Sequence, residues 1–202
     1  RGQNHVWYNK YSVATGKKVN TLFEETNDKW TEPEHDAVFL PNSTTNFLWF
    51  SERDGFMNLY QYTTEGKLVK QLTNFKGYDA EATVAEDGSK IVYTSISSGD
   101  LEVWTMNSDG SDKRMLTNKL GYDGGPFFSH DGNKIVWRAY YPETEKEISD
   151  YTSLINESMI RPMNLQIRVM NTDGTGKIQV TNNEGANFAP FFFPNDERIV
   201  FC

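Results

Sequence analysis

Acidic, amide and tyrosine side chains recur at matching places along this chain, before or at the start of short apolar segments. Carboxylates gathered in one place could hold a cationic group, such as a peptide amine or a Lys or Arg side chain, or a Ca²⁺ ion with oxygen ligands. The candidate ligand-binding residues are Glu32, Glu34, Asp79, Glu81, Tyr122, Asp123 and Asn187. The competing interpretation is that they are solvated loop acids and turn caps.

Other residues with catalytic or metal-binding chemistry are few. The three histidines are His5, His35 and His130, and His130 precedes an Asp-Gly pair, which indicates a turn residue. Glu32 and Glu34 would point to one face of a strand and His35 to the other, so they do not predict a metal site. The sequence contains no H-E-x-x-H, paired C-x-x-C or G-x-S-x-G motif. We therefore expect no catalytic residue, no metal and no cofactor in this chain.

The elements that would position the candidate residues are predicted to be short antiparallel strands. The stretch 78–117 contains Asp-Gly turns, which suit tight hairpins because Gly accepts a positive φ and Asp tolerates one. Its apolar segments are rich in Val, Ile, Tyr, Trp and Thr, as strands are. The expected strands are near 82–85, 90–95, 101–106 and the residues up to 117. Such a four-stranded meander of about 40 residues is the unit of a β-propeller blade.

Three kinds of marker show that this unit repeats in one register. An apolar-Thr pair recurs at steps of 44 and then 64 residues, at Leu72-Thr73, Leu116-Thr117 and Val180-Thr181. Turns follow the same steps, at Glu65-Gly66, Asp109-Gly110 and Asp173-Gly174. A second set of turns does so too, at Asp87-Gly88, Asp131-Gly132 and Asn195-Asp196. The fold predicted is therefore all-β, a β-propeller of four-stranded antiparallel blades.

The repeats divide the chain into blades whose strands are named a to d in chain order. Three whole blades are predicted at 29–77, 78–120 and 121–185, and the ends supply strands c and d (1–28) and strands a and b (186–202). The step of 64 residues exceeds the step of 44 because the third whole blade contains an insertion of about 20 residues. There, Thr144 and Glu147 have capping-box spacing, and an apolar face is formed by Ile148, Tyr151, Leu154 and Ile155. This predicts a helix near 144–158, ended by Pro162 and packed on the propeller flank.

The two incomplete ends leave two architectures open. The terminal strands could form one composite blade, which gives a self-closed ring of four blades, the low end of the usual range. Alternatively, the chain is part of a larger propeller that self-association, another chain or further residues would complete. An open ring exposes sheet edges and faces, which favours association.

Bulk composition excludes several classes of protein. The net charge of −8 argues against a phosphate-binding surface, so no nucleic acid partner is expected. No apolar run approaches the ~18 residues of a membrane span. Cys202 is the only cysteine, so no disulfide can form within the chain. The chain begins at Arg1 rather than at an initiator Met, so we expect any targeting segment to have been removed.

Two parts of the chain carry a family resemblance. The segment 30–62, which ends in SERDGFMNLYQY, resembles a blade from the N-terminal propeller of the dipeptidyl peptidase IV branch of the prolyl oligopeptidase family, and the resemblance covers residues 1–77. Residues 78–202 resemble TolB-like propeller repeats, through the runs EDGSKIVYTS, TMNSDGSDKRMLT, FFSHDGNKIVWRA and VMNTDGTGKIQVT. The inserted helix followed by Met-Ile-Arg-Pro is also similar to one subgroup of bacterial TolB-like proteins.

The first resemblance implies a non-catalytic binding or gating propeller that presents peptide substrate to a serine-peptidase domain outside this chain. Glu24-Glu25 is not in the context of the paired glutamates that hold a substrate amino terminus in that family, so we do not transfer that role to it. The second resemblance implies a TolB-like scaffold for a peptide or protein partner, unrelated to proteolysis. Both imply a periplasmic or extracellular location. A stand-alone enzyme, the third hypothesis, would need a catalytic constellation that we do not find.

Overall fold

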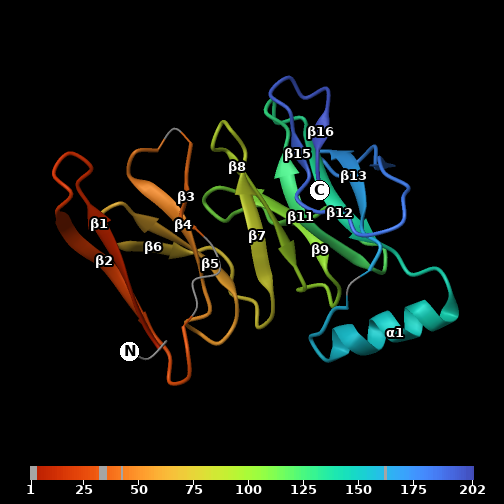
Figure 1. Ribbon diagram of the computed structural model, residues 1–202, viewed down its shortest axis with the longest axis horizontal. Coiled ribbons are helices and arrows are strands. Elements are labelled where there is room, and N and C mark those ends of the chain that lie inside the picture. The colour runs from red at the N-terminus through yellow and green to blue at the C-terminus, as the bar shows by residue number, and fades with distance from the viewer. Residues whose placement is uncertain (1–3, 32–35, 42, 162) are drawn as a thin grey trace. The chain divides into compact units, whose positions relative to one another are not determined.

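The computed structural model of the protein describes residues 4–31, 36–41, 43–161 and 163–202 (Figure 1). They form two compact units, residues 1–78 and 79–202. Both units are built from antiparallel strands, and one α-helix is inserted in the second. The prediction of an all-β fold with four-stranded antiparallel blades and one helix is therefore confirmed. In the described ranges, no helix is long and apolar enough to cross a membrane.

The first unit contains a two-stranded sheet and a complete blade. The two-stranded sheet pairs β1 (His5–Tyr11) with β2 (Lys18–Thr26). The blade has its strands in chain order, and these are β3 (Val38–Phe39), β4 (Asn46–Ser51), β5 (Asn58–Thr63) and β6 (Leu68–Gln71). Each strand is joined to the next by a hairpin, as the sequence markers predicted.

Aromatic side chains form the core between these two sheets. Phe23 from β2 stacks on Tyr62 from β5 with ring centroids 4.3 Å apart. Tyr8 from β1 meets Trp49 from β4 edge-on, also at 4.3 Å. Aromatic pairs in such arrangements add about 0.5–1.5 kcal/mol each beyond the burial of their area. The high aromatic content of the chain is thus used to pack sheet on sheet.

The second unit contains two complete blades and a short hairpin. The first blade comprises β7 (Asp79–Val84), β8 (Lys90–Ser95), β9 (Glu102–Asn107) and β10 (Arg114–Met115). The second comprises β11 (Tyr122–Phe128), β12 (Lys134–Tyr140), β13 (Gln166–Asn171) and β14 (Ile178–Gln179). The hairpin pairs β15 (Phe191–Phe192) with β16 (Ile199–Val200). Both blades have their strands in chain order.

The second strand of each blade is largely buried, and the fourth is exposed. Five consecutive residues are buried in both β4 and β8, whereas β6, β10 and β14 are exposed along their whole length. A strand covered on both faces reads as a continuous apolar run, and a strand with one wet face alternates. The apolar runs Phe47–Phe50 in β4 and Ile91–Tyr93 in β8 are unbroken because these strands are covered on both faces.

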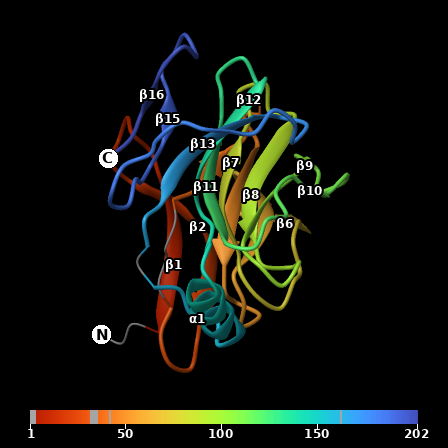
Figure 2. The same cartoon turned by 90° about the vertical axis from the view of Figure 1, so that its right-hand side faces the viewer.

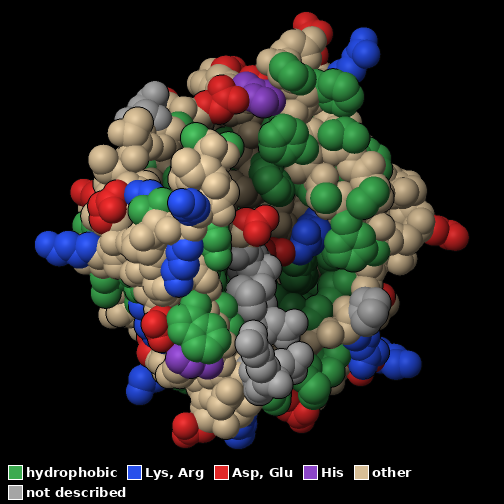
Figure 3. All heavy atoms as spheres, turned by 60° about the vertical axis from the view of Figure 1, so that its left-hand side comes forward, with side chains coloured by type: hydrophobic (Ala, Val, Ile, Leu, Met, Phe, Trp, Pro, Cys, Tyr) green, Lys and Arg blue, Asp and Glu red, His purple; other side chains and the backbone are tan. Residues whose placement is uncertain are grey.

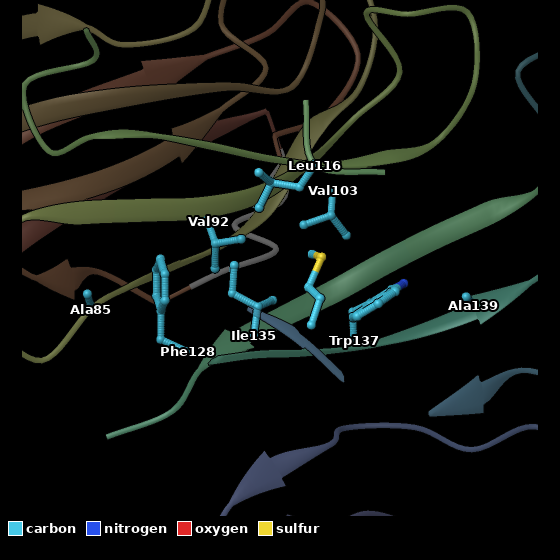
Figure 4. Close-up of a cluster of buried hydrophobic side chains, with 9 residues drawn as sticks. Ala85, Val92, Val103, Leu116, Phe128, Ile135, Trp137 and Ala139 are labelled. Carbon is cyan, nitrogen blue, oxygen red and sulfur yellow. The ribbon is translucent and has the colours of Figure 1, made fainter. Parts of the chain in front are cut away.

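The core of the second unit lies where its two blades face each other (Figure 4). Val92 and Val103 from the first blade meet Ile135 and Trp137 from the second, and all four side chains have no exposed surface. Burying side chains of this size stabilises the fold by about 1.5–3 kcal/mol each. The inter-blade contact is therefore a principal source of stability in this unit.

The first strand of each blade in the second unit, called its innermost strand below, starts earlier than the sequence predicts. β7 begins at Asp79 rather than near 82, and β11 begins similarly early in its blade, at Tyr122. The reason is a bulge in each strand, seen as a register shift between Ala80 and Thr83 and the corresponding one in β11. The bulge residues have left-handed φ values at steps of 44 and 64 residues, at Glu81 (53°), Gly125 (58°) and Ala189 (49°). An extra residue of this kind bends a strand and re-aims its side chains.

Helix α1 (Glu145–Asn156) lies at one end of the second blade (Figures 1 and 2). The capping box is present, since Thr144 Oγ1 accepts from Glu147 N at 3.2 Å and Glu147 Oε2 accepts from Thr144 N at 2.9 Å. Tyr151 and Ile155 are buried against Leu101. The predicted helix and its capping box are confirmed, while the proposed stop at residue 162 lies outside the described residues.

Candidate functional site

A polar junction recurs at each point where the third strand of a blade meets the residues after the fourth. The threonine of each apolar-Thr pair accepts a hydrogen bond from a backbone N–H of that third strand. The three bonds join Thr73 Oγ1 to Leu59 N (2.9 Å), Thr117 Oγ1 to Val103 N (2.8 Å) and Thr181 Oγ1 to Ile167 N (2.8 Å). The hydroxyl also contacts the residue one position earlier, which is Asn58, Glu102 or Gln166. The apolar-Thr pairs found in the sequence therefore have a structural role, because each threonine hydrogen-bonds to the third strand of its blade.

Three of the seven candidate residues are buried. They are Asp79, Asp123 and Asn187, with 4%, 0% and 3% of their surface exposed. Asp123 and Asn187 hold equivalent places, since their N–H groups donate to the carbonyl oxygens of Leu101 (2.9 Å) and Leu165 (3.0 Å). Their backbones thereby tie each blade to the following innermost strand.

The Asp123 carboxylate is held by aromatic donors. Trp137 Nε1 donates to its Oδ1 at 2.5 Å, and the Tyr141 hydroxyl donates to the same atom at 2.8 Å. Burial raises the pKa of the Asp123 carboxyl, although both of these donors lower it. Burial also raises the pKa of Glu102, and the Asp123 and Asp100 carboxylates raise it further. The pKa values of both acids are raised, but both side chains are buried and do not face solvent.

Glu81 and Tyr122 meet at a different place, around Arg138. One Glu81 carboxylate oxygen pairs with Arg138 Nη2, and the other accepts from Gly125 N at 2.8 Å and from the Thr94 hydroxyl at 2.9 Å. Arg138 Nη2 also donates to the Tyr122 hydroxyl at 2.8 Å. Burial and the neighbouring Glu81 raise the pKa of Tyr122 to about 12, so it stays a neutral phenol. This cluster joins β7, β11 and β12.

Glycine is required beside this cluster. Gly125 has a φ of +58°, and a Cβ there would lie 2.5 Å from Arg138 Nη1. The guanidinium therefore fills the space that a side chain would take. Arg138 was not among the candidates from the sequence, although a single arginine inside the apolar run of β12 is the signal that could have revealed it.

The remaining two candidates, Glu32 and Glu34, lie outside the described residues, as does His35. The structure therefore brings Glu81 and Tyr122 together, and it buries Asp79, Asp123 and Asn187. No group of three or more His, Cys, Asp and Glu side chains in the described ranges is arranged to hold a metal ion.

The first unit contains an ion pair between Arg53 and Glu25 that the sequence did not identify. Arg53 Nη2 lies 2.5 Å from Glu25 Oε1, and its guanidinium stacks 4.3 Å from the centre of the Tyr60 ring. Glu24 pairs instead with His5 at 2.8 Å. The two glutamates of the Glu24-Glu25 pair therefore have separate partners, as expected for neighbours on a strand, whose side chains point to opposite faces.

An apolar cleft of about 410 Å³ lies in the first unit. Aromatic side chains dominate its lining, which includes Trp7, Tyr8, Phe23, Phe39 and Trp49. Trp7 and Phe39 are 51% and 63% exposed, so the cleft is open to solvent. A cleft of this size and composition can accept an apolar or aromatic side chain of a peptide.

Comparison with known protein families shows which family the chain belongs to. The family model of the dipeptidyl peptidase IV (DPP IV) N-terminal region matches residues 1–146. The chain belongs to this family. The match continues well beyond Gly77, so it includes the complete blade β7–β10 and the strands β11 and β12. The family of the dipeptidyl peptidase IV N-terminal region thus covers parts of both units.

Solved structures show the same fold at low sequence identity. TolB from Acinetobacter baumannii is similar with a TM-score of 0.67 at 17% identity, over 97% of this chain and 45% of that one. Dipeptidyl peptidase 4 from Porphyromonas gingivalis has a TM-score of 0.62 at 14% identity, over 88% of this chain and 22% of that one. An oligogalacturonate lyase has a TM-score of 0.64 at 14% identity, over 100% of this chain and 55% of that one. The chain spans only part of the length of each, and one fold serves different activities.

Proposed function

We propose that this chain is part of a non-catalytic β-propeller that binds a peptide or protein and presents it to a domain outside this chain. The observation that carries the proposal is the family match over residues 1–146, since that family is the N-terminal region of a peptidase. The two units would belong to one propeller, either closed or completed by further strands. The part of the parent protein that cleaves peptides would be a separate serine-hydrolase domain.

The burial and ion pairing of the acidic candidate residues support a role in binding rather than in catalysis. The described acids at the starts of the innermost strands are buried or paired with a cation, so none is poised as a general base beside a nucleophile. Glu81 is the member that a ligand amine could reach, because its side chain keeps 19% of its surface exposed. A cationic ligand there would compete with Arg138.

The aromatic cleft of the first unit is a separate candidate site for an apolar side chain of a ligand. Large hydrophobic side chains are also exposed elsewhere on the chain, and Figure 3 shows them in green on one face. Exposed apolar side chains of this kind mark places where a protein or peptide can pack. They also favour self-association, which we include in the proposal.

The alternative is a TolB-like interaction scaffold that has no link to proteolysis. The TM-score of 0.67 to a TolB favours this second candidate, although at 17% identity the similarity establishes the fold alone. Both candidates place the protein in the periplasm or outside the cell. They differ in what is bound, because a peptidase module binds short peptides and a scaffold binds a folded partner.

One set of assays separates the candidates. With chromogenic dipeptide substrates we expect no turnover, and turnover above background would contradict the non-catalytic role. Peptides with a free amino terminus should quench or enhance tryptophan fluorescence saturably, whereas N-acetylated peptides should bind more weakly. Glu81→Gln should weaken binding of the free amine, and Glu184→Gln, on an exposed loop, is the matched control. Absence of peptide binding would favour the scaffold.

A further inference from the structure

His130 lies in the turn between β11 and β12, where its ring faces two hydrogen-bond acceptors. Nδ1 contacts a carboxylate oxygen of Glu86, and Nε2 lies 3.2 Å from the carbonyl oxygen of Phe192. Neither oxygen can donate a hydrogen. A neutral imidazole has one N–H group and can satisfy one of these acceptors, whereas an imidazolium has two and satisfies both. The contacts of the ring therefore match its protonated form.

These contacts connect three successive sheets of the second unit. Glu86 lies in the turn between β7 and β8, and Phe192 belongs to β15. The backbone around His130 adds to the connection, because the N–H groups of His130 and Asp131 donate to the Asp196 carboxylate at 2.8 and 2.9 Å. Asp196 lies in the turn between β15 and β16. One histidine thus bridges a turn of each blade to the last hairpin.

The β15–β16 hairpin is short. Each of its strands has two residues, and the ladder contains two residue pairs. Phe192 is its one fully buried side chain and packs with Val136 and Ile167. Phe191 is 43% exposed and meets the His130 ring edge-on, with 5.7 Å between centroids. Phe191 also meets the Phe127 ring edge-on at 5.4 Å. The two backbone bonds to Asp196 do not depend on the charge of the ring, so loss of a ring contact should loosen the hairpin without detaching it.

We propose that His130 is a protonation-dependent latch, which holds the β15–β16 hairpin to the preceding blades when the ring is charged and loosens it when the ring is neutral. The neutral ring must abandon either Glu86 or the Phe192 carbonyl, since it can donate to only one. Losing the Phe192 contact loosens the hairpin strand directly, and losing the Glu86 contact detaches the ring from the first blade.

The charges around the ring act in the same direction. The negative charges of Glu86 and Asp196 lie near the ring, and both favour its protonated form. The hydrogen bond to Glu86, and after it the bond to the Phe192 carbonyl, raises the pKa of His130 above its ordinary value of about 6.5. A histidine whose folded pKa is raised stabilises the fold fully below its unfolded pKa, and that contribution is lost as pH rises through the folded pKa. The latch therefore opens as pH rises through the raised pKa of the folded ring.

Hydrogen exchange of the hairpin amides at pH 6 and pH 8 tests the latch. The readouts are the N–H groups of Phe193 and Cys202, which bond to the carbonyl oxygens of Arg198 (2.9 Å) and Phe188 (3.0 Å). After correction for intrinsic exchange, their protection should fall by about threefold or more between these pH values, while that of Ile135 should not. His130→Gln should remove this pH dependence. Glu184→Gln, a change of one exposed carboxylate, should leave it unchanged.

NMR titration of the His130 ring gives a second, direct measurement. We expect its pKa to lie above 6.5 and to fall in Glu86→Gln, which replaces the charged acceptor by an amide. A ring that titrates at or below its ordinary value overturns the proposal, and so does hairpin exchange with the same pH dependence in His130→Gln as in the native chain. If His130→Gln does not fold, Glu86→Gln decides the question, because a His130 pKa unchanged by that substitution overturns the latch.

Discussion

Glu102 on β9 and Asp123 on β11 form a buried pair of carboxyl groups within hydrogen-bonding reach of each other. Each keeps one buried oxygen, Glu102 Oε2 and Asp123 Oδ2, without a donor among the described residues. One proton held between them would satisfy both, because a protonated carboxyl donates as well as accepts. The next junction has amides at the same places, Gln166 and Asn187, which donate to Asn183 and Leu165 instead.

Glu102→Gln should stabilise the protein above neutral pH. Burial raises the pKa of both carboxyls, so the folded chain keeps a proton that the unfolded chain releases from about pH 4 upward. Stability is therefore expected to fall as pH rises from about 4 through the raised folded pKa values, and the amide should reduce that fall by removing the contribution of Glu102. We expect urea denaturation at pH 8 to show a gain of about 1–3 kcal/mol in the free energy of unfolding. Glu184→Gln is the control, and a loss of stability in Glu102→Gln at pH 8 would contradict the shared proton.

Thr117→Val should destabilise the junction between the two blades of the second unit. Valine has the shape of threonine but cannot accept the hydrogen bond from Val103 N, which leaves a buried N–H without a partner. The expected cost is about 1–3 kcal/mol, measured by chemical denaturation. Thr117→Ser keeps the hydroxyl and should cost less. Equal effects of the two substitutions would contradict this, because they would mean that losing the methyl group costs as much as losing the hydrogen bond.

Arg138→Leu should cost more than an ordinary surface ion pair does. The substitution leaves the Glu81 carboxylate largely buried without its cation, for which we expect about 2–4 kcal/mol in the free energy of unfolding. Glu81→Gln combined with Arg138→Leu removes both charges and should recover part of that loss. The coupling is measured by a double-mutant cycle. Strictly additive single effects would mean that the two side chains do not interact.

Thr144→Ala should weaken the start of α1 without disturbing the blades. The threonine hydroxyl caps Glu147 N, and loss of such a cap costs about 1 kcal/mol. The loss should appear as faster hydrogen exchange in the first turn of the helix. Thr152→Ala, at an exposed position within the same helix, is the control and should change little. Global destabilisation by Thr144→Ala beyond about 2 kcal/mol would mean that the helix contributes more to folding than its cap suggests.

Much of the fold could be predicted from local chemistry. Asp-Gly turns, apolar-Thr pairs and the capping box at Thr144 act between residues close in the chain, so their spacing reveals hairpins, blades and the helix. The sequence predicts a later start for the first strand of these blades, because the observed start depends on a bulge at Glu81 and Gly125. That bulge is stabilised by pairing with the next strand and by Arg138, and neither leaves a periodic signal in the sequence.

By itself the sequence determined the all-β class, the repeat and the inserted helix, because these follow from periodicity and turn chemistry. Tertiary structure alone decided what the candidate acids do. Asp79, Asp123 and Asn187 hold corresponding places in the repeat and are buried, whereas Glu81 pairs with a cation 57 residues further along the chain. Burial and charge pairing across such distances depend on how blades stack, which residue types and local spacing do not encode.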